Sequence, residues 1–186
     1  MRRLAISFLF LSLLASASLP SRAQQHDGVL NESEVERIRD SNQVPPARVL
    51  VYQKILDTRA KRLEDLMAKR RAAGREEDIH EILEQFVTIA DELDDNLEDY
   101  AAKHLDTRKA LPKLVEATER WATALKQPPE HSAYSVQRKL ALQSVSDLRA
   151  AATKLLADQN AWFLAHPPAK PPPERPQGYE LPPPKG

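Results

Sequence analysis

The chain has 186 residues, with 27 basic and 27 acidic side chains, four glycines and no cysteine. The balanced charge excludes the clustered basic excess that is typical of nucleic-acid-binding proteins. The missing cysteine excludes a disulfide framework and a cysteine nucleophile. The sequence also lacks a Gly-x-Ser-x-Gly elbow, a His-Glu-x-x-His motif and a glycine-rich phosphate loop. We therefore expect a non-enzymatic protein, and the sequence assigns no catalytic, cofactor-binding or metal-binding residues.

The first 23 residues have the pattern of a secretory signal peptide. A short basic start precedes the apolar run Leu4–Leu19, and Ser21-Arg22-Ala23 provides small residues at the cleavage positions, with residues 15–17 as an alternative site. Three of the 27 basic residues lie in this segment, so its removal leaves 24 basic and 27 acidic residues. No later apolar run is long enough to span a bilayer. We expect a bacterial periplasmic or secreted protein after cleavage near Ala23.

Glycine and proline are sparse between residues 29 and 166, and they separate long segments rich in strong helix formers. Four helical segments are predicted: 46–73, 75–105, 108–126 and 132–165. Pro112 marks a late start or a kink in the third segment, because proline removes one helix hydrogen bond. Each segment repeats apolar residues at steps of three and four, which indicates a helix with one buried face.

The predicted buried faces define the expected core. They contain Val49, Tyr52, Leu56, Ala60, Leu63 and Met67; Ile79, Ile82, Leu83, Phe86, Ile89, Ala90, Leu93, Leu97 and Tyr100; Leu111, Leu114, Val115, Thr118, Trp121, Ala122 and Leu125; and Ala141, Val145, Leu148, Ala152, Leu155, Leu156, Trp162 and Phe163. Short connections make consecutive helices antiparallel neighbours. The expected fold is therefore all-α: an antiparallel up-down-up-down four-helix bundle over residues 24–166, with a short extra N-terminal helix.

Residues 27–39 resemble the second half of a calcium-binding EF-hand loop. An aspartate, a glycine, Asn31 and Glu34 match ligand or turn positions, but the first and third ligand positions would hold alanine and glutamine. The same residues can start a helix without an ion. Asn31 suits an N-cap, Glu34 completes a capping box, and Leu30 and Val35 can form a hydrophobic staple. We predict a helix cap.

Eleven acidic residues and no lysine or arginine lie between Glu76 and Asp99. Four of these acids share a face opposite the apolar stripe: Asp91, Asp94, Asp95 and Glu98. The second half of the preceding helix is basic, through Arg59, Lys61, Arg62, Lys69, Arg70, Arg71 and Arg75. In a hairpin that turns at Gly74, opposite charges would lie side by side, so we expect ion pairing and solvation of the acids.

Metal binding is the alternative for the acidic helix. Glu77 and His80 have the Glu-x-x-His spacing that di-iron bundles use, although no second such motif is present. The alternative function is a metal-binding bundle in which Glu77, His80 and Glu84 combine with acidic residues of the 76–99 helix. The aromatic residues Trp121, Trp162 and Phe163 are predicted to be core anchors, or a cap over one end of the bundle.

The last twenty residues, 167–186, include nine prolines. Proline has a fixed φ and no amide donor, so this tail is predicted to be a disordered spacer that samples polyproline II. The segment Lys170–Pro176 also fits a basic-x-x-P-x-x-P pattern, which offers docking to a proline-recognition domain as the alternative.

The segments RKALPKLVEATERWATALKQPP (108–129) and GREEDIHEILEQFVTIADELDDNLEDY (74–100) resemble a family of exported, all-helical bacterial proteins of unknown function. The resemblance covers residues 26–166. It implies an all-helical fold and export, and it implies no activity and no site residues. The expected role is an envelope or secreted interaction or structural protein, whose partner is another protein or an envelope component.

Overall fold

The computed structural model describes residues 28–167. Within this range the chain forms five helices and no strand, which confirms the predicted all-helical fold. The helices are α1 (Glu32–Asp40), α2 (Pro45–Ala68), α3 (Arg75–Ala102), α4 (Leu111–Lys126) and α5 (Ser135–Ala165). The predicted signal peptide and nearly all of the proline-rich tail lie outside the described residues.

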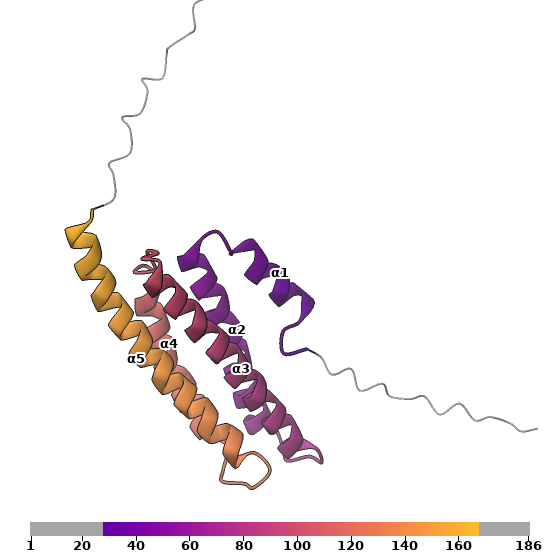
Figure 1. Cartoon of the computed structure of the whole chain (residues 1–186). Coiled ribbons are helices and arrows are strands. Elements are labelled where there is room, and N and C mark those ends of the chain that lie inside the picture. Colours follow the sequence, from indigo (N-terminus) through magenta and orange to yellow (C-terminus); the bar gives the residue numbers. More distant parts are fainter. Residues whose placement is uncertain (1–27, 168–186) are drawn as a thin grey trace, which may run out of the picture.

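The four long helices pack into a bundle, and α1 is the predicted short extra helix, packed against α2 (Figure 1). Both α2 and α5 pack against α3 and α4, so α3 and α4 occupy one diagonal of the bundle. The sequence predicts that all consecutive helices are neighbours. This holds for α2–α3 and for α4–α5, but α3 and α4 are not close neighbours. The connection between those two helices, residues 103–110, is long enough to cross the end of the bundle.

The predicted faces form most of the core. Every predicted face residue of α3 is buried, and Phe86 meets Trp121 of α4 edge to face with ring centroids 5.7 Å apart. The prediction fails at the end of α5, where Trp162 and Phe163 are only half-buried. Gln159 takes the last buried position on that helix instead. Its side chain accepts a hydrogen bond from the Thr107 amide at 2.9 Å and donates one to the Leu105 carbonyl at 2.7 Å, which fixes the 103–110 connection.

The second helix ends earlier than predicted. It stops at Ala68 rather than at residue 73, and Gly74 is the N-cap of α3, with a left-handed φ of 84°. The physical reason is Arg75, which donates hydrogen bonds to the carbonyls of Leu66 and Met67 at 2.8 and 3.0 Å. These bonds satisfy carbonyls of the last turn of α2 that have no partner within the helix.

The fourth helix begins late, as one of the two interpretations of Pro112 predicted. Helix α4 starts at Leu111, so the proline lies in its first turn. The first-turn amides of a helix have no intrahelical acceptor, and proline costs nothing there.

Candidate functional site

The first polar cluster is at the start of α1, and it confirms the predicted capping box. The Asn31 side chain accepts a hydrogen bond from the Glu34 amide at 3.0 Å, and the Glu34 carboxylate accepts one from the Asn31 amide at 3.0 Å. The hydrophobic staple between Leu30 and Val35 stays a prediction. Leu30 packs against the core, but Val35 is 45% exposed.

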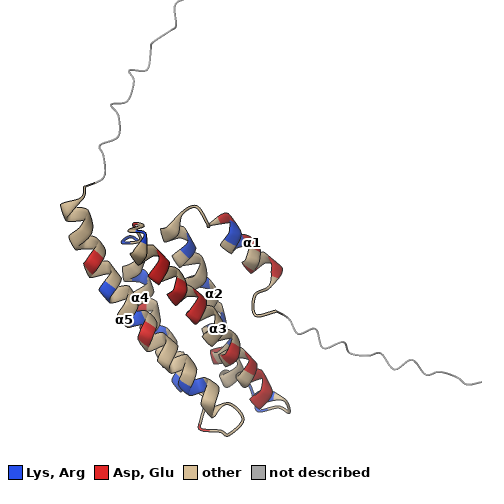
Figure 2. Ribbon diagram, in the orientation of Figure 1, with Lys and Arg blue, Asp and Glu red and all other residues tan. Residues whose placement is uncertain are grey.

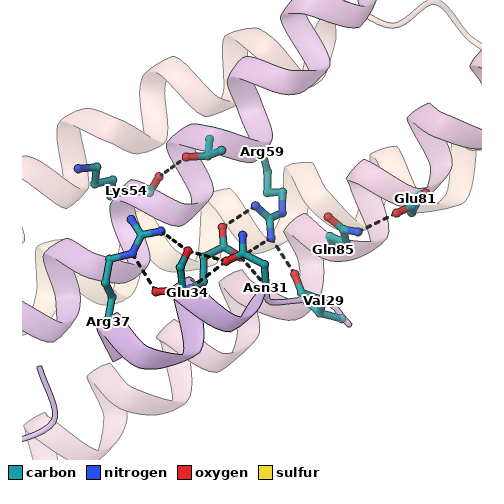
Figure 3. A network of polar contacts seen from close by, with 10 residues as sticks. Val29, Asn31, Glu34, Arg37, Lys54, Arg59, Glu81 and Gln85 are labelled. Carbon is teal, nitrogen blue, oxygen red and sulfur yellow. Dashed lines mark hydrogen bonds and ion pairs between the residues drawn. The ribbon is translucent and has the colours of Figure 1, made fainter. Parts of the chain in front are cut away.

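Glu34 has a second partner that the sequence did not indicate. The guanidinium of Arg59 in α2 donates to both Glu34 carboxylate oxygens at 2.8 Å, and to the Val29 carbonyl at 2.8 Å (Figure 3). The two side chains are 9% and 4% exposed, so this ion pair is buried. Burial alone would raise the pKa of Glu34, but the hydrogen bonds from Arg59 and from the Asn31 amide outweigh it and hold the pKa below its usual value.

This ion pair fixes α1 on the bundle. It also occupies the carboxylate that would be the last ligand of an EF-hand loop, at position 12, where such a loop needs a bidentate glutamate. The aspartate that precedes Gly28 lies outside the described residues. Within the described part, the cluster is a helix cap and a docking contact.

The second polar feature is the acidic face of α3, which we define as Glu77, Glu81, Glu84, Asp91, Asp95 and Glu98. These six residues recur at steps of three, four and seven, and all are exposed. Figure 2 shows acidic residues along most of the length of α3. The row from residue 77 to residue 98 spans about 32 Å at 1.5 Å per residue.

The predicted ion pairing between α2 and α3 is largely absent. Of the eleven acids between Glu76 and Asp99, two form a salt bridge with any residue in the range 28–167. Glu76 pairs with Arg71 of the α2–α3 loop, and Asp99 pairs with Lys103 beyond the end of α3. Two bases of α2 pair elsewhere, because Arg59 pairs with Glu34 of α1 and Lys61 pairs with Asp65 within its own helix.

The acids near the middle of α3 repel one another. Asp94 is half-buried, and its Oδ1 atom is buried with no hydrogen-bond partner among the described residues. Burial raises the pKa of Asp94, and the nearby carboxylates of Glu98 and of Asp147 in α5 raise it further. Carboxylates of α3 and α5 therefore repel one another at Asp94, across the boundary between the two helices.

A buried phenol joins the other side of α3 to α2. The Tyr52 hydroxyl donates to Glu92 at 2.5 Å, and Arg48 donates to the same hydroxyl at 3.4 Å. Burial raises the pKa of Tyr52 to about 12, with Glu92 adding to the effect. Tyr52 was predicted as a core residue from its spacing, but nothing in the sequence distinguishes Glu92 as its acceptor among eleven acids.

The metal candidates are not brought together with further ligands in the described structure. Glu77 and Glu84 are exposed, and His80 directs its Nδ1 atom to the Ala133 carbonyl at 2.9 Å. Among residues 28–167, no group of three or more histidine or acidic side chains has an arrangement that could hold a metal ion.

The aromatic candidates divide between two places. Trp121 is a core anchor, 1% exposed, and its indole N–H donates to Asp57 of α2 at 2.7 Å. Trp162 lies at the end of α5 instead, and the rings of His104 and His166 stack on it with centroids 3.7 and 3.9 Å away. This stack lies at the C-terminal end of α5, and its role as a cap over one end of the bundle stays a prediction.

An open groove of about 830 Å³ follows α2 and the start of α3. Both signs of charge line it, with Lys54, Lys61, Arg62 and Lys69 beside Asp57, Asp65 and Asp78. The mixed lining favours neither a cationic nor an anionic ligand. The acidic face is the only one of these surfaces in the described range with a long row of one charge, so it is the candidate site.

The acidic face presents exposed carboxylates to solvent. Exposed carboxylates accept charge-assisted hydrogen bonds from lysine and arginine side chains. Comparison of the chain with protein-family models, with curated proteins and with solved structures finds no match in any of the three. Within residues 28–167, none of the helices has a stretch both long and apolar enough to cross a membrane.

Proposed function

We propose that the chain is an exported, non-enzymatic protein whose helical bundle binds a basic segment of another envelope or secreted macromolecule through the acidic face of α3. One observation carries this proposal. Six exposed carboxylates follow one line of the helix, and none forms an ion pair with another residue in the described range. If these acids had only a structural role, lysines or arginines placed among them would make the helix more stable.

The physical basis is a row of like charge on a rigid support. A single exposed ion pair contributes only about 0–1 kcal/mol. Several such pairs on one straight helix act on the same partner, and their summed field attracts a basic segment before contact. The buried side of α3 provides the rigidity, because its apolar residues from Ile79 to Tyr100 are fixed in the core.

We also propose that the four long helices alternate in direction, as an up-down-up-down bundle with a diagonal α3–α4 connection. The bonds Tyr52–Glu92 and Arg75–Leu66 support antiparallel α2 and α3. The bonds His80–Ala133 and Ser144–Asp91 support parallel α3 and α5.

Export is proposed from the signal-like first 23 residues. The prediction is that protein recovered from a bacterial envelope fraction begins at Gln24, and intact mass spectrometry checks it. Recovery with the first residue still present would contradict cleavage near Ala23.

The interaction is tested by capture of binding proteins from the native envelope fraction. The test variant combines Glu84→Gln, Asp95→Asn and Glu98→Gln on the acidic face. The matched control combines Glu36→Gln, Asp40→Asn and Glu116→Gln, which removes the same charge from exposed positions on α1 and α4.

We expect the test variant to lose at least about tenfold in affinity for the captured protein, since three exposed pairs are removed. The control variant should bind like the wild type, and wild-type binding should weaken as salt rises. Equal capture by the test and control variants would reject the acidic face as the binding surface.

A further inference from the structure

The outer face of α5 has a pattern that the bundle does not use. The inner face packs against α3 and α4, with its buried residues from Ala141 to Gln159. On the opposite face, nine exposed positions recur at alternating steps of four and three. They are Val136, Leu140, Gln143, Asp147, Ala150, Lys154, Ala157, Ala161 and Leu164, which we call the outer stripe.

The spacing of the outer stripe is the heptad spacing of a two-helix coiled coil, which averages 3.5 residues. Apolar side chains are at its ends, where Val136, Leu140 and Leu164 are 65%, 47% and 85% exposed. These three are among the five large exposed hydrophobic residues of the described chain. In Figure 1, α5 lies at the edge of the bundle, with its outer side away from the other helices.

The stripe is complementary to itself when it is reversed. If a second α5 lies antiparallel, with Ala150 opposite Ala150, then Val136 lies opposite Leu164 and Leu140 lies within one residue of the position opposite Ala161. Gln143 then lies opposite Ala157. The same register places Asp147 of each copy within one residue of the position opposite Lys154 of the other. Alanines at the centre allow the two helices to approach closely, and the two crossed ion pairs fix the register.

We propose that the chain forms a homodimer through antiparallel pairing of the outer stripes of two α5 helices. The charges of the stripe select this partner. Neither charge has a strong competing interaction within the protomer: Asp147 accepts hydrogen bonds from the Gln143 amide, and Lys154 makes an exposed pair with Asp158. The contact has two-fold symmetry, so it closes at two copies rather than extending into a filament.

The first test is the oligomeric state of the purified chain by sedimentation equilibrium. We expect a wild-type dimer. Asp147→Lys places two like-charged pairs across the contact, and so does Lys154→Asp. Each single variant should raise the dissociation constant at least about tenfold.

An equimolar mixture of the two variants should restore the dimer, because both crossed pairs become attractive again. The double variant, with both changes in one chain, should also be a dimer.

Asp95→Lys and Lys113→Asp are the controls, since both positions are exposed and lie on α3 and α4 rather than on the outer stripe. They should leave the dimer unchanged. Leu164→Glu is a second disrupting variant at a position too exposed to affect folding, and it should also give monomers. A monomeric wild type, or single reversals that dimerise like the wild type, would overturn the proposal.

The second test uses the absence of cysteine from the sequence. Ala150→Cys lies on the two-fold axis of the proposed contact, so mild oxidation should produce a disulfide-linked dimer. Thr123→Cys, which is exposed on α4, should remain unlinked under the same conditions. A failure of Ala150→Cys to form a disulfide in a chain that is a dimer would overturn the antiparallel register.

Discussion

At the scale of single residues, Glu34 links local and tertiary structure. Its carboxylate caps the first turn of α1 and also neutralises the buried guanidinium of Arg59. A buried ion pair gives little net stability compared with an apolar pair, but removal of one partner leaves the other charge buried without compensation. The pair therefore determines where α1 can lie.

The first prediction is the effect of Glu34→Ala. We expect it to destabilise the docked state of α1 by about 3–5 kcal/mol, since Arg59 remains buried without its counter-charge. Urea unfolding and hydrogen exchange of the α1 amides measure the loss. Glu36→Ala, on the exposed side of the same helix, should cost less than about 0.5 kcal/mol. Adding Arg59→Leu to Glu34→Ala should recover part of the loss, and no recovery would contradict a charge-based cause.

The second prediction follows from the lowered pKa of Glu34. The unfolded carboxyl has a pKa near 4.5, and Arg59 holds the folded value below it. The stability that the ionised group contributes is therefore complete above pH 4.5, and it is lost as the pH falls through the folded pKa. The difference in unfolding free energy between the wild type and Glu34→Gln should shrink over that range. A difference that stays constant down to pH 3 would show that the charge is not involved.

The burial of Arg59 was predictable from the sequence, but its partner was not. It lies three residues after Leu56 and four before Leu63, so its spacing matches the apolar stripe of α2. A charged residue on a buried face needs a counter-charge. That rule could have identified Arg59 as buried. It could not have identified Glu34 as the partner, because 25 residues separate the two and many other acids were available.

At the scale of elements, α3 has two chemically different faces. The apolar side forms the core, and the acidic side faces solvent.

The third prediction compares the loss of stability caused by a substitution on each of these two faces. Phe86→Ala should cost about 3–5 kcal/mol, because the side chain is fully buried against Trp121. Asp95→Asn should change stability by less than about 0.5 kcal/mol. Thermal melts of the two variants check this, and equal losses would mean that the faces are wrongly assigned.

The fourth prediction concerns the end of α5. Gln159→Leu removes the hydrogen bonds to the buried amide of Thr107 and to the Leu105 carbonyl, and it leaves those groups without partners. We expect a cost of about 1–3 kcal/mol for the unsatisfied groups. Asn160→Leu is exposed and is the control. Chemical denaturation measures both, and an equal effect of the two changes would show that Gln159 does not hold the 103–110 connection.

The end of α5 also explains one failure of the sequence prediction. Periodicity placed Trp162 and Phe163 on the buried face, but α5 is 31 residues long and α4 is only 16. At the end of α5 the neighbours are loop residues, and the Arg108 guanidinium lies over the Phe163 ring at 4.4 Å. Spacing predicts which side of a helix faces inward, but not where the neighbouring helix stops.

At the scale of the whole molecule, helix number, helix type and core faces were predictable, because each depends on residues close together in the sequence. The diagonal placement of α3 and α4 was not predictable, since it depends on contacts such as Thr107–Gln159 between residues 52 positions apart. Only one part of the candidate site, the position of its acids along the helix, was predictable from the sequence. The row of acids is visible in the sequence, but its lack of ion pairs within residues 28–167 is not, since Arg59 and Lys61 pair elsewhere.

Carboxyl footprinting measures whether the acidic face of α3 is the binding surface that we propose. The purified chain is labelled with a carbodiimide and an amine, alone and in complex with the protein captured from the envelope fraction. We predict reduced labelling of Glu84, Asp95 and Glu98 in the complex, and unchanged labelling of Glu36 and Glu116. Protection of the two control acids, with the acidic face labelled as in the free chain, would show that the partner binds elsewhere.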